Sequence, residues 1–164
     1  IPDLKNPRWS YATSKGLGEQ AIISSNLNYI IIRPHNIYGP HQINHFVPEF
    51  IERCKKKKIV LYGWKNTRSW LFIDDCCKAI EKIIKTKKAY NQIINVGSND
   101  EKRVIDVARI ILKELNIKKK IIKKDAPQGS AKRRRPDISK LKKIIKWYPK
   151  TSLENGIKKT VNIK

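Results

Sequence analysis

The chain has few acidic residues and no methionine. Its 164 residues include 14 Asp and Glu against 37 Lys and Arg, which gives a formal net charge of +23 at pH 7. Such an excess invites a nucleic-acid-binding function, because Lys and Arg release counterions from phosphates. Short basic runs occur at 55–58, 118–120 and 133–135, but most of the lysine is scattered and no helix-turn-helix, zinc-finger or aromatic-basic signature accompanies it. The composition therefore predicts nonspecific affinity for polyanions and no specific nucleic-acid partner.

Cysteine is scarce, and long apolar runs are missing. Cys54, Cys76 and Cys77 form no CxxC pair, and their odd number argues against the disulfide framework of a secreted protein. A reducing, cytoplasmic location fits these residues best. No apolar run approaches the length of a membrane span, so we expect no membrane association.

The sequence also offers no clear metal site. His41 and His45 would share a face only if their segment were helical, and Pro40 breaks that segment. Neither a carboxylate nor a thiol lies close to them in sequence. We expect these histidines, together with His35, to be ordinary residues of a polar loop, and we expect no metal.

The apolar pattern of the rest predicts an α/β protein. We expect strands at 29–33, 59–61, 70–73 and 92–96, a loop at 1–8, and a lysine-rich stretch at 116–135 in which Pro127 and Gly129 mark a loop. We expect helices at 10–26, 46–54, 74–86, 104–115 and 137–147, and a last one from residue 152. The residues expected to cap helices are Ser10, Asp74 or Asp75, Asp137 and Ser152.

The stretch WSYATSKGLGEQ, at 9–20, carries the first candidate site. Tyr11 and Lys15 are four residues apart, so they lie on one face of the predicted helix. A nearby cation favours the phenolate, and Tyr11 could then take or give a proton. A Tyr/Lys pair at this spacing arises often by chance, so its interpretation depends on other motifs.

Four later stretches provide those motifs: RPHNIYGPHQ, LYGWKNTRSWLFIDD, IINVGSNDEKRVIDVARII and RRRPDISKLKKIIKWYPKTSLENGIKKTV. Together with the YxxxK pattern, and in this order, they resemble the extended short-chain dehydrogenase/reductases, in particular the nucleotide-sugar epimerases, dehydratases and decarboxylases. The resemblance implies the C-terminal part of a Rossmann-type parallel sheet plus a small α+β substrate-binding lobe. It assigns 1–36 and 73–97 to the NAD-binding domain and 37–72 and 98–164 to the lobe. The N-terminal half, with its glycine-rich loop, would be missing.

Roles for individual residues also follow from the resemblance. Tyr11 would be the acid/base partner of hydride transfer, and Lys15 would hold the nicotinamide ribose of NAD and tune the tyrosine. Pro34 would lie against the nicotinamide. Asn36 would reach the sugar or the diphosphate of the substrate, although a turn residue is the alternative, and Tyr62 would flank the nucleobase or be a plain aromatic at the end of a strand.

Two arginines would bind the diphosphate from opposite sides. Arg68 is the first, since a guanidinium offers a planar fork of donors that a lysine lacks. Many relatives follow this arginine with aspartate, whereas this chain has Ser69, so the local loop chemistry can differ. The second is Arg134, with Arg133 and Arg135 as alternatives.

The sequence contains no convincing glycine-rich loop for binding phosphate. Gly16, Gly18 and Ala21 match the spacing G-x-G-x-x-G/A, but SYATSK precedes them instead of a strand, and no acid occurs between Asn26 and Pro48. We therefore expect these glycines to admit a neighbouring backbone or the cofactor.

The implied activity is the transient, NAD-dependent oxidation of a nucleotide-diphosphate sugar at its 4-position, followed by epimerisation or dehydration. A decarboxylase of the same family is an alternative, and so is a non-catalytic basic fragment that binds nucleic acid. The full-length protein would be a homodimer. The nucleotide sugar and the choice between NAD and NADP stay open at this point.

Overall fold

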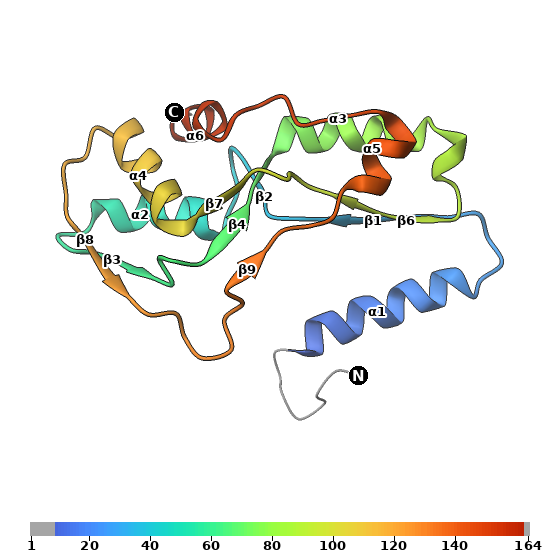
Figure 1. Cartoon of the computed structure of the whole chain (residues 1–164), viewed down its shortest axis with the longest axis horizontal. Helices are drawn as coiled ribbons and strands as arrows, with labels where there is room; N and C mark the ends of the chain where they lie inside the picture. The colour runs from blue at the N-terminus through green and yellow to red at the C-terminus, as the bar shows by residue number, and fades with distance from the viewer. Residues whose placement is uncertain (1–8, 163–164) are drawn as a thin grey trace.

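A computed structural model describes residues 9–162, so the loop expected at 1–8 lies outside the described residues. The helices are α1 (Ser10–Ile23), α2 (Phe46–Lys55), α3 (Ile73–Ile84), α4 (Val104–Glu114), α5 (Ser139–Ile145) and α6 (Leu153–Val161) (Figure 1). The strands are β1 (Ile30–Pro34), β2 (Ile37–Tyr38), β3 (Ile59–Tyr62), β4 (Thr67–Ser69), β5 (Leu71–Phe72), β6 (Gln92–Val96), β7 (Glu101–Arg103), β8 (Ile121–Lys124) and β9 (Arg133–Arg134). This is the α/β class that the sequence predicts.

One hydrophobic core surrounds the parallel pair β1–β6. Its strands run in register from Ile30↔Gln92 to Pro34↔Val96. Ile94 and Val96 are fully buried and share this core with side chains of α3 and α5. Apolar, β-branched residues suit such a strand because a parallel sheet is covered by helices.

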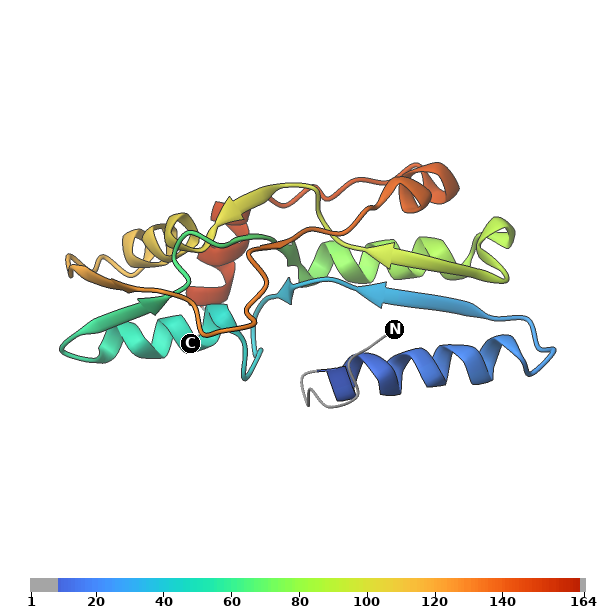
Figure 2. The ribbon, with the colours of Figure 1, turned by 60° about the horizontal axis from the view of Figure 1, so that its bottom comes forward.

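A second core lies at the other end of the molecule, where α2, α4 and α6 pack on short sheets (Figures 1 and 2). β3 pairs with β8, and β4 lies between β7 and β9. The short parallel pair β2–β5 joins the two ends, and its Tyr38 and Phe72 meet edge to face with ring centroids 5.6 Å apart. The division into domains predicted from the sequence stays a prediction; α5, expected in the substrate lobe, packs on α3 and β6.

Helix α1 stands apart from both cores, and both ribbon views show it running alongside β1 and β6 (Figures 1 and 2). None of its residues is buried. Within residues 9–162 its main tie is an ion pair between Glu19 and Arg33 of β1, with Arg33 Nε 2.7 Å from Glu19 Oε1. Leu17 is 67% exposed. The helix therefore presents its apolar residues to solvent.

The expected helix caps are only partly correct. The Ser152 hydroxyl accepts a hydrogen bond from Asn155 N at 3.2 Å, which confirms that cap. Ser10 is wrong as a cap, because it is the first residue of α1 and Trp9 takes the cap position. Asp74 and Asp75 are also wrong, because α3 begins earlier, at Ile73. Starting the helix at Ile73 leaves both aspartates in its first turn.

Asp75 has another structural role. It is buried, and its Oδ2 accepts hydrogen bonds from the backbone nitrogens of Lys150 at 3.0 Å and Thr151 at 2.7 Å. It thereby fixes the segment before α6 against α3. Asp137, one position before the cap of α5, accepts hydrogen bonds from the Ser139 hydroxyl at 2.5 Å and from Ser139 N at 2.8 Å. These bonds, the hydroxyl first, lower the pKa of Asp137.

Two strands occur within the lysine-rich stretch 116–135, where the sequence indicates only a loop marked by Pro127 and Gly129. β8 pairs with β3 from Ile59↔Ile121 onward, and β9 pairs with β4 at Arg68↔Arg134. Both strands are rich in lysine or arginine, which hides the alternation of a typical strand. Among residues 9–162, every helix is too short or too polar to cross a bilayer.

Candidate functional site

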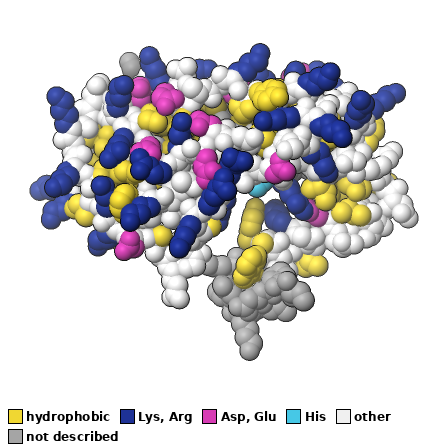
Figure 3. Space-filling view, viewed as in Figure 1, with side chains coloured by type: hydrophobic (Ala, Val, Ile, Leu, Met, Phe, Trp, Pro, Cys, Tyr) yellow, Lys and Arg dark blue, Asp and Glu magenta, His cyan; other side chains and the backbone are white. Residues whose placement is uncertain are grey.

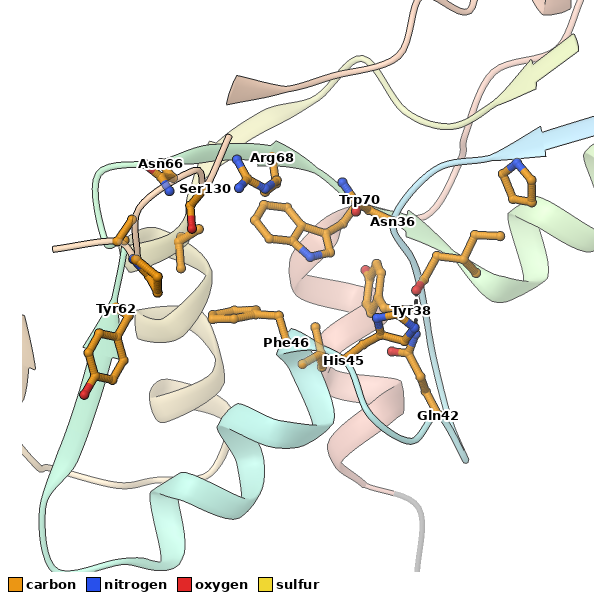
Figure 4. A pocket seen from close by; sticks show the side chains of 17 residues that line it. Asn36, Tyr38, Gln42, His45, Phe46, Tyr62, Asn66, Arg68, Trp70 and Ser130 are labelled. Carbon is orange, nitrogen blue, oxygen red and sulfur yellow. Dashed lines mark hydrogen bonds between the residues drawn. The ribbon is translucent and has the colours of Figure 1, made fainter. Parts of the chain in front are cut away.

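A pocket of about 500 Å³ opens where β1 and β3 end. Ligands of open α/β sheets gather at such carboxyl ends. Four of the residues predicted from the sequence line it: Pro34, Asn36, Tyr62 and Arg68. Its other lining side chains include Gln42, His45, Phe46, Asn66, Trp70 and Ser130 (Figure 4).

Two amides in the pocket wall have unused polar atoms. Asn36 Nδ2 and Gln42 Oε1 are buried and have no hydrogen-bond partner within residues 9–162. Gln42 uses its Nε2 to donate to Ile37 O at 2.7 Å. Asn36 has a φ of 43°, in the left-handed region that asparagine tolerates better than most residues. An unpartnered buried donor is costly, so a ligand acceptor at Asn36 would be favourable.

Arg68 reaches the pocket from β4. Its Nη1 donates to Thr67 O and its Nη2 to Ala131 O, both at 2.7 Å. Burial, and secondarily the charge of Arg134 on the neighbouring strand, lower the pKa of the Arg68 guanidinium. Two like charges held this close favour an anion beside them. The adjacent Ser69 is fully buried, and its hydroxyl has no partner within the described residues.

Within residues 9–162, only one of the three arginines at 133–135 is paired with a carboxylate. Arg133 binds Glu101, with Nη2–Oε2 at 2.8 Å and Nε–Oε1 at 2.9 Å. Arg134, at the strand position beside Arg68, has no ion pair within residues 9–162. Arg134 is exposed and does not line the pocket itself. The geometry therefore leaves Arg134 available for an anion at the pocket's edge.

Aromatic rings form the floor of the pocket, a feature that sequence reasoning missed. Phe46 stacks on Phe50 at 5.6 Å between centroids and tilts against Trp70 at 6.1 Å. Figure 4 shows Phe46 and Trp70 between Tyr62 and Asn36. The sequence assigned Phe46 to the apolar face of a helix, which α2 confirms. It assigned Trp70 to a strand at 70–73, which is wrong, because Trp70 lies between β4 and β5. Periodicity also cannot tell a core ring from a pocket ring.

Tyr11 and Lys15 meet on α1, as their spacing predicts. Lys15 Nζ lies 5.6 Å from the centroid of the Tyr11 ring, and Tyr11 is 71% exposed. Neither residue lines the pocket. A Cβ added at Gly16 or Gly18 would find no described atom within 4 Å, so this side of α1 is open.

The described residues hold no cluster of three or more His, Cys, Asp or Glu side chains suited to a metal ion. His45 lines the pocket, while His41 lies on a separate surface depression.

Comparison with known proteins gives the site a context. Residues 2–97 match the model of the NAD dependent epimerase/dehydratase family. The chain belongs to that family. The match includes α1 with Tyr11 and Lys15, and it ends directly after β6.

The curated relatives carry related activities. The chain is 32% identical to UDP-N-acetyl-alpha-D-glucosaminuronate decarboxylase of Bacillus cytotoxicus, over 94% of this chain and 52% of that protein. It is 29% identical to a putative UDP-glucose 4-epimerase of Methanocaldococcus jannaschii, over 96% of this chain and 53% of that protein. The family member described here thus spans about half the length of these relatives.

Solved structures of this family share the fold. The dTDP-glucose 4,6-dehydratase of Bacillus anthracis, solved in complex with NAD, superposes with a TM-score of 0.80 at 29% identity, over 93% of this chain and 50% of the other. The UDP-glucose 4-epimerase of Thermotoga maritima, solved with UDP-glucose, gives 0.77 at 25% identity, over 92% and 50%. These neighbours confirm a Rossmann-type α/β fold.

Proposed function

We propose that this chain supplies the substrate pocket and the Tyr/Lys pair of an NAD-dependent nucleotide-sugar epimerase or dehydratase. The observation that carries the proposal is the pocket that joins Asn36, Tyr62 and Arg68, with Arg134 one strand away. A nucleotide sugar has a flat base, a doubly charged diphosphate and a polar sugar. The pocket offers an aromatic floor, two guanidinium groups and unpartnered amides to match them.

The residues present fit one end of NAD. Tyr11 and Lys15 share an exposed face of α1, and the open space at Gly16 and Gly18 leaves room beside that face. Pro34 ends β1 at the pocket wall, where the resemblance puts the nicotinamide. The glycine-rich loop for the pyrophosphate is not found in this chain. When bound, NAD supplies the hydride acceptor that sugar oxidation needs.

The chain's own residues would then move one proton and hold the substrate. Tyr11 Oη would remove the proton of the sugar 4-hydroxyl, and the charge of Lys15 would stabilise the phenolate that accepts it. Arg68 and Arg134 would bind the diphosphate, so that binding energy far from the reacting carbon orients the sugar. Asn36 would use its free Nδ2 for a substrate oxygen.

The step after oxidation separates three activities. A decarboxylase is a second candidate, because the Bacillus cytotoxicus relative, at 32% identity, carries that name. Epimerases, dehydratases and decarboxylases differ in acid/base groups that we expect in the part of the relatives that this chain does not cover. A homodimer as full-length protein and a cytoplasmic location are also part of the proposal; free Cys54, Cys76 and Cys77 fit the latter.

The test uses a full-length protein that contains this chain. Tyr11→Phe should lower turnover of a UDP- or dTDP-sugar by about 10²–10⁴-fold, the usual contribution of a general acid/base. The same variant should bind the nucleotide sugar as the parent does, because it loses only a hydroxyl. Turnover is followed by NADH absorbance and product analysis, and binding by calorimetry.

Arg68→Gln is the matched variant and should show the reverse pattern. It keeps the proton-transferring phenol but loses the charged fork, so its affinity for the nucleotide sugar should fall by about tenfold or more. Full turnover by Tyr11→Phe would contradict the proposed role of Tyr11 as the acid/base residue. Unchanged substrate affinity in Arg68→Gln would contradict the proposal that this pocket binds the nucleotide sugar.

A further inference from the structure

Two segments of the chain contain many cations and no acid. Residues 53–65 and 115–124 together hold eleven Lys and Arg and neither Asp nor Glu. The two segments are separated in sequence by the 49 residues 66–114. Each run of lysines directly precedes one strand of the β3–β8 pair.

The parallel register brings the two lysine runs side by side. Because Ile59 pairs with Ile121, the residues just before each strand, 56–58 and 118–120, enter the pair at the same edge. Neighbouring strands are about 4.8 Å apart. Lys119 fastens the runs together, since its Nζ donates to Cys54 O at 2.9 Å and to Lys56 O at 3.0 Å. We call Lys55–Lys58 with Lys118–Lys120 the lysine edge.

The charges of the lysine edge are exposed and almost unopposed. All seven side chains belong to exposed residues. Within residues 9–162, Lys55 alone among them makes an ion pair, with Glu52 at 2.6 Å. Figure 3 shows Lys and Arg side chains along the border of the molecule where β3 and β8 lie in Figure 1. Like charges packed this closely repel one another unless an anion lies between them.

We propose that the lysine edge binds the phosphodiester backbone of nucleic acid without sequence preference. Rows of flexible ammonium groups on neighbouring strands suit a chain of regularly spaced phosphates, and they carry no fixed donor pattern to read base edges. A membrane surface is less suited, because interfacial elements pair their cations with a broad apolar face. The seven residues of the lysine edge include no apolar side chain.

This site is distinct from the substrate pocket. Tyr62, Gly63 and Ala126 line the pocket at or just after the carboxyl ends of β3 and β8, whereas the lysine edge lies at their amino ends. Four residues of strand separate the two, or about 13 Å. The proposal therefore does not depend on the activity proposed above, and substitutions at the edge leave the pocket residues in place.

The test compares two variants of equal net charge. One carries K57Q, K58Q, K118Q and K120Q; Lys119 is kept because its ammonium bonds the backbone. The control carries K78Q, K82Q, K87Q and K88Q, which are exposed lysines in and after α3 at the far end of the molecule. Fluorescence anisotropy measures the affinity of each for a labelled 20-nucleotide single strand and for a duplex of the same length, at 50 to 300 mM salt.

The edge variant should lose about a hundredfold or more in affinity at 50 mM salt for both oligonucleotides. The slope of log K against log[salt] should fall by about 3, because each phosphate contact contributes about 0.7–0.9. The control should lose less than about threefold. Equal losses in both variants would mean that binding follows total charge, and would overturn the proposal.

Two further measurements keep the test decisive. Vesicles of phosphatidylserine and phosphatidylcholine that bind the wild-type chain as tightly as the oligonucleotides do would overturn it in favour of an anionic surface. Hydrogen exchange of the wild-type chain needs no variant to fold. Added oligonucleotide should protect amides at 55–62 and 118–124, and protection confined to other segments would contradict the proposal.

Discussion

At the scale of single residues, Glu101 shows how a carboxylate organises an arginine-rich surface. It accepts hydrogen bonds from Arg133, and from the Thr67 hydroxyl on the adjacent strand. These bonds, Arg133 first, lower the pKa of Glu101 from its usual 4.5 to about 2. The pairing engages the Arg133 guanidinium, whereas Arg134 has no ion pair within residues 9–162.

This shift predicts a pH-dependent contribution to stability. Because the folded-state pKa is depressed, the ionised carboxylate stabilises the fold above about pH 4.5, and that stabilisation is lost as the pH falls through about 2. Glu101→Gln should therefore melt at a lower temperature than the parent at pH 7. The difference should shrink below pH 4.5 and vanish near pH 2. Thermal melts followed by circular dichroism across that range measure it; a difference that does not change with pH would contradict the assignment.

The three cysteines are predicted to differ in reactivity. Cys54 and Cys76 are buried, and burial raises the pKa of both thiols, that of Cys76 to about 11. Cys77 is exposed. Because the thiolate is the nucleophile, iodoacetamide at pH 7.5 should alkylate Cys77 first and leave the other two unmodified until the chain unfolds. Peptide mass spectrometry gives the order, and Cys77→Ser should remove the fast phase.

The sequence predicted which side chains lie together where a motif determined their spacing. The contact between Tyr11 and Lys15 follows from the helix period alone, and the joining of Asn36 with Arg68 follows from the resemblance. The partners of buried polar groups could not be predicted. Asp75 binds backbone atoms 75 and 76 positions later, and no local pattern specifies such a long-range bond.

At the scale of elements, α6 is held by a close approach at one glycine. A Cβ at Gly156 would lie 2.0 Å from the Tyr38 hydroxyl and 3.0 Å from Phe72 Cδ2. Tyr38 has little room to move, because it is buried and its hydroxyl donates to Leu153 O at 3.3 Å. Glycine therefore lets the helix lie directly on the β2–β5 pair that joins the two cores.

Gly156→Ala should destabilise the protein, although alanine is the better helix former. Overpacking costs about 1–3 kcal/mol, and the gain in helix propensity recovers at most about 1 kcal/mol. Urea denaturation should show a lower midpoint. Gly16→Ala is the matched control in α1, where nothing described lies within 4 Å, and it should leave the midpoint unchanged or raise it. Equal effects of the two substitutions would contradict the packing of α6.

Helices and strands with a periodic pattern of apolar residues could be predicted from the sequence. Strands that form only because a neighbouring strand offers an open edge could not. The strand at 92–96 and the helix at 104–115 match the structure to within one residue, because apolar spacing determines them. β8 and β9 were missed, because they are short and their residues are mostly charged. They form strands because β3 and β4 offer open edges, which is a tertiary effect.

At the scale of the whole molecule, the pocket and the Tyr/Lys pair belong to regions of very different packing. The pocket rests on a core that is closed within the described residues, whereas α1 has no buried side chain. The chain spans about half the length of the curated relatives that it matches. Substrate binding by the pocket should therefore be retained in this chain, while cofactor binding should not.

We accordingly predict that the 164-residue chain binds NAD only weakly and turns over no nucleotide sugar. No glycine-rich loop at a helix N-terminus is present to hold the pyrophosphate, which leaves only contacts at the nicotinamide end. Calorimetry should give a Kd for NAD weaker than about 1 mM, that is, less than about 4 kcal/mol of binding free energy. UDP-glucose and dTDP-glucose serve as internal controls, because both should bind more tightly than NAD and lose that affinity in Arg68→Gln. Micromolar binding of NAD to this chain would show that a phosphate site exists within it, and would contradict this prediction.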